Sequence, residues 1–449
     1  MPFIHYKNGG VVIALVDCNN FYCSCERLFL PRLAEQPIVV LSNNDGCIIS
    51  RSDEAKRLGV EMGGPYFMAR PLLLKHNIQV FSSNYNLYGD MSWRVMETLR
   101  CLYGKDTVEV YSVDEAFVNL QGFAPERLPT LALQMKEQVE MWTGIKVSVG
   151  IAPTKVLAKM ANKLAKKDKQ KTNCIWLLDT REKINAALRN TPVADIWGIG
   201  RRYAQKLQND WGIYDAFQLS RMSDAFGKAK LGGVVGVRLL QELQGKAVID
   251  MKEELITKKM IATTRMFGSA VSNIQSIKEA IASYTSRAAE KLRRQYSAAG
   301  CISIFVIKKD TNHDLNFRGA SVSASRLLPV ASSFTHELIK PALEMVDSIF
   351  EPGKMYKKAG VILSDIVPDA AIQGNLFDHS LRSNHRRLMA MIDNINFSQR
   401  DDVLKFAASG TTRNWKMRQE LRSPRYTTRW NELCEINYDV KRKNKAAHK

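Results

Sequence analysis

The chain lacks any apolar run long enough to cross a membrane. Its 449 residues are 45% apolar, but no stretch reaches the roughly 18 consecutive apolar residues that mark a membrane-spanning helix. The short apolar run near the N-terminus ends at Asp17, which argues against a secretory signal peptide. No long amphipathic basic helix stands out, so no membrane partner is expected.

Cysteine is sparse and scattered. The eight cysteines include no C-x-x-C pair, which argues against both a zinc site and a disulfide framework. The sequence therefore predicts a protein of a reduced, cytoplasmic compartment.

Acidic residues are in the minority. Asp and Glu total 45 against 65 Lys and Arg, which gives a formal net charge of +20. A chain this basic usually meets a polyanion, although a generally basic surface with no specific partner is the alternative. The length is sufficient for several domains, each with its own core.

Three acidic residues stand out because they lie where apolar segments end or bend. Asp17 closes the apolar segment 11–17, and Asp114 and Glu115 lie within the segment 108–117. Three carboxylates at one point repel one another unless cations lie between them. Two Mg²⁺ ions held in this way are the apparatus of nucleotidyl transfer, and the backbone carbonyl of Cys18 offers a further oxygen ligand. The alternative is that Asp17 and Asp114 cap helices or turns.

Two details of this cluster depend on local geometry. Neighbouring residues on a strand face opposite sides, so Asp114 and Glu115 share a site only if the hairpin twists there. Tyr22 follows Asp17 at the start of an expected helix, where its ring can pack beneath a nucleotide sugar and exclude a 2′-hydroxyl. Phe21 fits an ordinary core position better.

The order of strand and helix signals predicts two separate α+β units. Residues 10–190 favour a ferredoxin-like sheet with one face covered by helices, interrupted by an insertion at 23–84. Residues 195–245 are predicted to be helical, and residues 258–365 follow the order β-α-β-β-α-β. The basic tail that follows is predicted to be partly disordered.

Lysines recur on one expected helix at 154–166. Lys155, Lys159, Lys163 and Lys166 lie three or four residues apart, and therefore on one helix face. Such a row is stable when anions lie opposite, and DNA or nucleotide phosphates would serve. A solvated lysine face is the alternative.

A second basic element follows two glycines. Gly198 and Gly200 precede Arg201 and Arg202 in a pattern that resembles a helix-hairpin-helix. Glycines leave the backbone N–H groups of the next helix open to a phosphate, and the arginines add charge. Such a unit holds the backbone of a duplex without reading its sequence.

Taken together, these motifs closely resemble those of the Y-family, lesion-bypass DNA polymerases. The resemblance rests on Val16–Tyr22, Ser112–Phe117 and Ser148–Lys159, while Ser42–Cys47 and Ser50–Lys56 resemble the bacterial UmuC branch. It implies an error-prone polymerase of SOS mutagenesis that transfers nucleotides from dNTPs to a primer 3′-OH by two-metal catalysis. It also implies a multidomain α+β, right-hand fold: a ferredoxin-like palm (1–22 and 85–190), small fingers (23–84), a helix-hairpin-helix thumb (191–250), a β-α-β-β-α-β little finger (251–366) and a basic tail (367–449).

The resemblance also assigns roles to individual residues. Asp17, Asp114 and Glu115, with the carbonyl of Cys18, match the ligands of two Mg²⁺ ions. Tyr22 matches the steric gate against ribonucleotides, and Lys166 matches a triphosphate-binding lysine. Lys56 falls near the position where many relatives place a triphosphate-binding arginine, but Asp53 replaces the usual tyrosine of that motif. The residues expected to bind DNA are Lys159, Gly198, Gly200, Arg201 and Arg202.

The region after residue 367 suggests protein partners. Gln373, Leu376 and Phe377 resemble the peptide with which bacterial proteins bind the sliding clamp. The alternative is that Leu376 and Phe377 pack under the little finger. Aromatic residues interleaved with arginine further along suit protein or nucleic-acid contact: Trp415, Tyr426 and Trp430. The resemblance implies that the partners are primer-template DNA, dNTPs, the clamp, a processed UmuD-type dimer and a RecA filament. It also implies a bacterial cytoplasmic protein that is associated with the nucleoid.

Two other functions compete with this interpretation. A nucleotide cyclase on the same kind of palm needs no hairpin thumb and no clamp peptide. A non-catalytic DNA-binding scaffold has no use for three coordinated carboxylates beside Tyr22.

Overall fold

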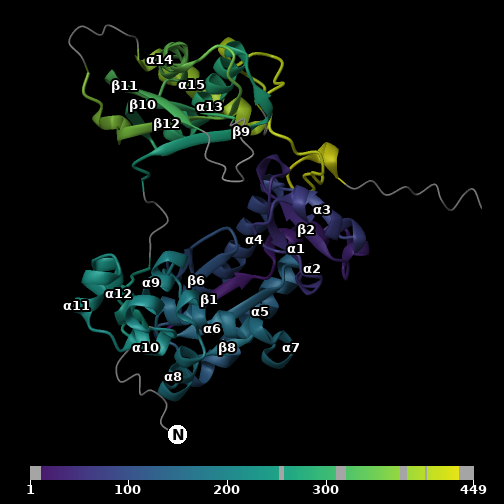
Figure 1. The fold of residues 1–449 in the computed structure, drawn as a ribbon, viewed down its shortest axis with the longest axis vertical. Helices are drawn as coiled ribbons and strands as arrows, with labels where there is room; N and C mark the ends of the chain where they lie inside the picture. The colour runs from purple at the N-terminus through teal and green to yellow at the C-terminus, as the bar shows by residue number, and fades with distance from the viewer. Residues whose placement is uncertain (1–11, 252–256, 310–319, 375–381, 400–401, 434–449) are drawn as a thin grey trace, which may run out of the picture. The chain divides into compact units, whose positions relative to one another are not determined.

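The computed structural model describes residues 12–251, 257–309, 320–374, 382–399 and 402–433. The chain forms two compact units (Figure 1). The first contains Met1–Leu41, Cys47–Glu254 and Leu421–Lys449, and the second contains Ser42–Gly46 and Leu255–Glu420. No helix in the described part of the chain is long and apolar enough to span a membrane.

A five-stranded sheet lies at the centre of the first unit, in the order β5-β6-β1-β7-β8. All neighbouring strands are antiparallel except β7 and β8. The first four positions correspond to the 2-3-1-4 order of a ferredoxin-like sheet, as predicted. The strands are β1 (Ile13–Cys18), β5 (Val108–Val110), β6 (Glu115–Asn119), β7 (Val147–Ala152) and β8 (Ile175–Leu177).

Helices cover both faces of this sheet, so the prediction of a single covered face is wrong. Ala14 and Val16 of β1 pack against α1 (Phe21–Leu28), α4 (Tyr85–Tyr103) and α5 (Leu128–Thr143). Ile13 and Leu15 point the other way and pack against α6 (Lys155–Lys167).

Glycine at position 150 of β7 allows α6 to lie this close. A Cβ there would come within 2.2 Å of the backbone nitrogen of Asn162 in α6. The Asn162 side chain in turn donates to the carbonyl oxygens of Leu15 and Ser148, at 3.2 and 2.9 Å. The helix is thereby fixed on the strands that carry the acidic residues.

The remainder of the first unit consists of a small sheet and a group of helices. The three-stranded sheet has the order β3-β2-β4 and its own core with α2 and α3. The later helices share the apolar core of α6. The bounds are β2 (Ile38–Leu41), β3 (Ile48–Arg51), α2 (Asp53–Arg57), α3 (Tyr66–Lys75), β4 (Gln79–Ser82), α7 (Lys169–Thr172), α8 (Arg181–Arg189), α9 (Arg201–Trp211), α10 (Ala216–Ser220), α11 (Asp224–Lys230) and α12 (Val234–Leu243).

The second unit has the predicted order of elements, β-α-β-β-α-β. Its antiparallel sheet is ordered β11-β10-β12-β9, and α13 and α14 pack together against it (Figure 1). The elements are β9 (Ile261–Val271), α13 (Ile274–Arg294), β10 (Ser297–Lys308), β11 (Ser321–Ser332), α14 (Thr335–Ile349) and β12 (Tyr356–Pro368).

The described part of the tail is folded onto the two units. Helix α15 (Arg382–Ser398) is held to α13 by two bonds of 2.7 Å between Arg293 and Asp393. Trp415 is buried in the core of the second unit and Tyr426 in that of the first, so the prediction that these two contact partners is wrong. Trp430 is 91% exposed.

Candidate active site

The strand register brings the predicted metal ligands to one end of the central sheet. Asp17, near the end of β1, lies directly opposite Glu115, the first residue of β6. Asp114 lies in the bend before β6, where its carbonyl oxygen accepts from the N–H of Cys18 at 2.8 Å. Because Asp114 is outside the strand, the alternation of a pleated strand does not send it away from Glu115.

The pKa of Asp17 reflects its neighbours, the other two carboxylates among them. Burial raises the pKa of Asp17 to about 6, against the opposing effect of Lys166, and the charges of Glu115 and Asp114 raise it further. The Asp114 carboxylate also accepts a hydrogen bond of 2.6 Å from the Ser112 hydroxyl. This part of the sheet therefore concentrates negative charge.

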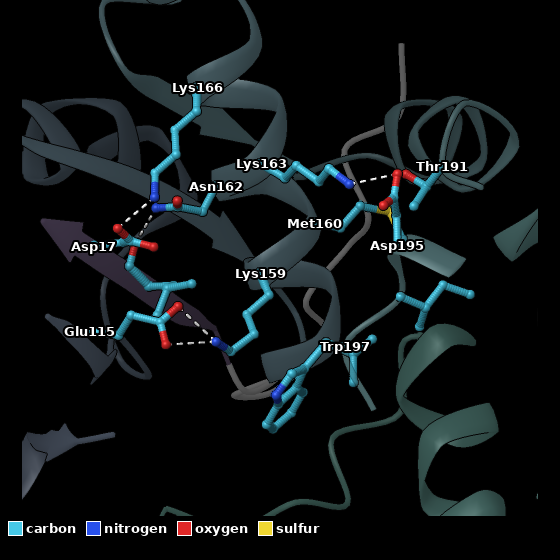
Figure 2. Close-up of a pocket in the computed structure, with 13 residues that line it drawn as sticks. Asp17, Glu115, Lys159, Met160, Asn162, Lys163, Lys166, Thr191, Asp195 and Trp197 are labelled. Carbon is cyan, nitrogen blue, oxygen red and sulfur yellow. Dashed lines mark hydrogen bonds and ion pairs between the residues drawn. The ribbon is translucent and has the colours of Figure 1, made fainter. Parts of the chain in front are cut away.

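Two lysines of α6 lie against these carboxylates (Figure 2). Lys166 Nζ is 2.5 Å from Asp17 Oδ1, and Lys159 Nζ donates to both oxygens of Glu115 at 2.8 and 2.9 Å. The Lys159 ammonium group also lies over the rings of Tyr111 and Trp197, 4.5 and 5.3 Å from their centroids. Each ammonium group supplies positive charge where a divalent ion would otherwise supply it.

The other lysines of the predicted row also face carboxylates of the protein. Lys155 is buried and pairs with Glu109, so it is not available to a phosphate. Lys163 pairs with Asp195 at 2.6 Å, and this pair is about half exposed. Anions do lie opposite the lysine row, but in this structure they are carboxylates of the same chain; that DNA or nucleotide phosphates bind there stays a prediction.

A cavity of about 240 Å³ opens beside Asp17 and Glu115, with a lining that is partly apolar and partly charged. Lys159 and Lys166 point to these carboxylates at one part of its lining, and Lys163 points to Asp195 at another (Figure 2). Charged groups of both signs therefore line a space that suits a charged ligand.

The carboxylate oxygens of this site lie further apart than the possible metal-ligand atoms of a second cluster, in α14 and α15. Among the described residues, only His336, Glu337 and His385 bring three such atoms within 4.8 Å of one another. The carboxylates near β1 lie further apart, with lysines beside them. Their hard oxygen donors fit Mg²⁺. The His-Glu-His cluster was missed from the sequence because α14 and α15 bring together residues that no short spacing connects.

Tyr22 lies in the first turn of α1, on a layer of other tyrosines. Its ring stacks on Tyr88, with centroids 4.5 Å apart and planes at 17°, and meets Tyr85 edge-on at 6.0 Å. Burial, with smaller contributions from Tyr85 and Asp114, raises the pKa of Tyr22 to about 12. Phe21 is buried in the core, as expected.

Lys56 and Asp53 of α2 form a network that links the small sheet to the site. Lys56 Nζ lies 2.9 Å from Asp53 Oδ1 and 2.5 Å from the side-chain oxygen of Asn20, in the turn between β1 and α1. Lys169 pairs with the same Asp53. Burial alone would raise the pKa of Asp53, but the hydrogen bonds from Lys169 and Lys56 outweigh it and hold the pKa well below its usual range. Asp53, which replaces the usual tyrosine of that motif, thus forms ion pairs with two lysines.

The N-terminus of α9 is open. Gly200 is its N-cap and provides no side-chain cap, and Gly198 before it has a φ of 95°, which favours glycine. Arg201 and Arg202 are exposed. The first N–H groups of an 11-residue helix and two guanidinium groups therefore lie on one surface.

Four parts of the chain match known protein families. Residues 16–163 match the impB/mucB/samB family, and residues 258–376 match the C-terminal domain of the same family. Residues 181–213 match the IMS family HHH motif, which includes the start of α9. Residues 386–436 match a domain of unknown function.

Full-length relatives carry the same likeness. The chain is 40% identical to "Protein UmuC" of Salmonella typhimurium over 95% of its own length and all of that protein. It is 39% identical to "Protein ImpB" of the same species, over 94% of this chain and 99% of that one. It is 27% identical to "DNA polymerase IV" of Brucella melitensis, over 82% and 78%.

A solved structure shows the same fold. A Y-family DNA polymerase chimera superposes with a TM-score of 0.63, covering 80% of this chain and 99% of the chimera at 20% identity. The predicted fold class is confirmed.

Proposed function

Because this chain belongs to the impB/mucB/samB family, we propose that it is an error-prone translesion DNA polymerase that transfers nucleotides from dNTPs to a primer 3′-OH during SOS mutagenesis and DNA damage tolerance. The observation that carries the chemistry is that Asp17, Asp114 and Glu115 all lie at one end of the sheet, beside a cavity with charged groups in its lining.

We assign the metal site to these three carboxylates and the carbonyl of Cys18, which suit two Mg²⁺ ions. Bound there, the ions would lower the pKa of the primer hydroxyl and neutralise the leaving pyrophosphate. Lys166 pairs with Asp17 in this structure and would turn to the triphosphate if Asp17 held a metal ion instead. Lys159 would likewise have to leave Glu115 before it could contact DNA.

Two further groups surround the nucleotide in this proposal. Tyr22 packs against the sugar and excludes a 2′-hydroxyl. Lys56 grips the triphosphate from the fingers, and Asp53 with Lys169 orients it. The hydrogen bond that Lys56 donates to Asn20, in the turn between β1 and α1, supports this placement.

Binding of the primer-template is assigned to the open end of α9. The backbone N–H groups after Gly198 and Gly200 bind a phosphate, and Arg201 and Arg202 add charge-assisted bonds. Contacts of this kind hold DNA regardless of sequence, as lesion bypass requires.

The remaining partners are proposals from the family. They are the sliding clamp, through Gln373, Leu376 and Phe377, a processed UmuD-type dimer and a RecA filament, in a bacterial cytoplasm close to the nucleoid. Gln373 is described, whereas Leu376 and Phe377 lie outside the described residues. We also propose the predicted domain limits, 1–22 and 85–190, 23–84, 191–250, 251–366 and 367–449.

Primer extension with Mg²⁺ tests the proposal. Asp114→Asn should lower dNTP incorporation at least about a hundredfold, since it removes one charge from the metal ligands. Asp90→Asn is the matched control, because Asp90 pairs with Arg94 on the surface of α4 and should keep the parent's rate. An Asp114→Asn protein as active as the parent would exclude this site, and a parent that binds DNA without extending it would favour the scaffold alternative.

A further inference from the structure

The tail returns to the first unit just beyond residue 420 and pairs with the end of β4. Ser82 donates its N–H to the carbonyl of Leu421 at 3.0 Å, and its hydroxyl oxygen accepts from the N–H of Leu421 at 3.0 Å. Arg422 forms an isolated parallel bridge with Ser82. Tyr426 is buried and stacks on Phe29, with centroids 4.7 Å apart. The segment Leu421–Tyr426 is therefore an integral part of this unit.

The same segment is held at the start of α4. Asn84, the N-cap of α4, is buried and donates through its side chain to the carbonyl and hydroxyl oxygens of Ser423, both at 3.0 Å. It also donates to the carbonyl of Pro424 at 3.1 Å. These three bonds place Ser423 beside Glu26 of α1.

A chain of contacts runs from Ser423 to Tyr22. Glu26 is fully buried, and its Oε1 accepts a hydrogen bond of 2.6 Å from the Tyr88 hydroxyl. Its Oε2 is buried without a hydrogen bond of ordinary geometry, while the Ser423 hydroxyl lies near enough to lower the pKa of the carboxyl. The Tyr88 ring, 1% exposed, is the surface on which Tyr22 stacks.

Each link in this chain restricts the next. Tyr88 cannot shift along its ring plane without breaking its bond to Glu26, and a buried polar group left unpaired is costly. Glu26 is fully buried, and Ser423 of the tail lies near the side of it that Tyr88 does not contact. Burial raises the pKa of Glu26 to about 7, against the opposing effects of the Tyr88 hydrogen bond and the nearby Ser423 hydroxyl, as expected for a carboxyl that water does not reach.

We propose that residues 421–426 position the sugar-selecting ring of Tyr22 through Ser423, Glu26 and Tyr88, so that the tail contributes to the discrimination between deoxyribonucleotides and ribonucleotides. Tyr88, Glu26 and Ser423 are positioning residues here, because Tyr22 alone meets the sugar. The inference rests on the proposed polymerase activity and on the role of Tyr22 in it.

The ratio of kcat/KM for a dNTP to kcat/KM for the matching rNTP tests the inference. Tyr88→Phe keeps the stacked ring and removes the bond to Glu26, which should lower this ratio about tenfold, the value of one buried hydrogen bond. Tyr103→Phe is the control: its hydroxyl donates to the carbonyl of Leu131 at 3.3 Å at the far end of the same helix. It should leave the ratio unchanged even where it lowers the melting temperature.

Two shortened chains test the tail directly. A chain ending at Leu433 keeps the docked segment and should discriminate like the parent. A chain ending at Glu420 loses the segment and should discriminate less, with dNTP incorporation retained; Ser423→Ala serves if that chain does not fold.

The outcomes separate the two levels of the argument. If the parent extends no primer, the proposed function fails; if Tyr22→Ala leaves the ratio unchanged in an active enzyme, the role of Tyr22 fails. If Tyr22→Ala lowers the ratio but Tyr88→Phe and Ser423→Ala do not, or if Tyr103→Phe lowers it equally, the inference about the tail is overturned.

Discussion

Replacing Lys155 by methionine should strongly destabilise the first unit. The Lys155 and Glu109 side chains are 1% and 5% exposed, and Lys155 Nζ also donates to the carbonyl of Asp250 at 2.8 Å. Methionine fills a similar volume but removes the cation that balances the buried Glu109 carboxylate. Breaking one side of a buried ion pair costs about 3–5 kcal/mol.

A surface pair on the same helix provides the matched control. Lys163 and Asp195 are 53% and 44% exposed, so Lys163→Met should cost less than about 1 kcal/mol. The double variant Lys155→Met, Glu109→Leu removes both charges and should recover part of the stability lost in the single variant, because no buried charge remains.

Hydrogen exchange in increasing urea measures these differences locally, at the amides of β5 and β6. The free energy of opening there should fall in Lys155→Met and recover partly in the double variant. Equal losses for Lys155→Met and Lys163→Met would refute the reasoning, because burial would then make no difference. So would a double variant no more stable than Lys155→Met alone.

Two more predictions concern Glu26 and the tail linker. Because folding raises the pKa of Glu26 from 4.5 to about 7, the folded state holds a proton that the unfolded state releases, and stability falls as pH rises between those values, by about 3 kcal/mol in total. Glu26→Gln should remove this dependence of the free energy of unfolding on pH. The urea midpoints of the variant at pH 5.5 and 8 should then be similar, whereas those of the parent differ. If the variant's stability depends on pH as the parent's does, the effect belongs to other groups. Deleting residues 373–377 should reduce processivity with the clamp and leave distributive synthesis intact, measured by product length on a primed template with and without clamp; equal loss without clamp would contradict a docking role.

Local patterns predicted much of the secondary structure. The expected helix at 154–166 matches α6 to within one residue at each end, and the second unit has the expected order of elements, because both depend on periodicity along a short stretch of chain. The strand end near Asp17 was predictable for the same reason. The pairing of Asp17 with Glu115 follows once β1 and β6 are neighbours.

Contacts between distant residues were not predictable in this way. The sequence shows a lysine row, but not that Lys155 finds Glu109, 46 residues earlier. It shows aromatic residues among arginines, but not that Tyr426 stacks on Phe29. The bend that holds Asp114 outside β6 and the close approach of α6 at Gly150 also depend on tertiary packing.

The ammonium groups of α6 have a consequence for how this protein assembles. Lys159 and Lys166 balance Glu115 and Asp17 from within the chain, so the acidic end of the sheet has its countercharge as soon as the helix docks. These two ion pairs therefore balance the acidic end of the sheet without a bound cation.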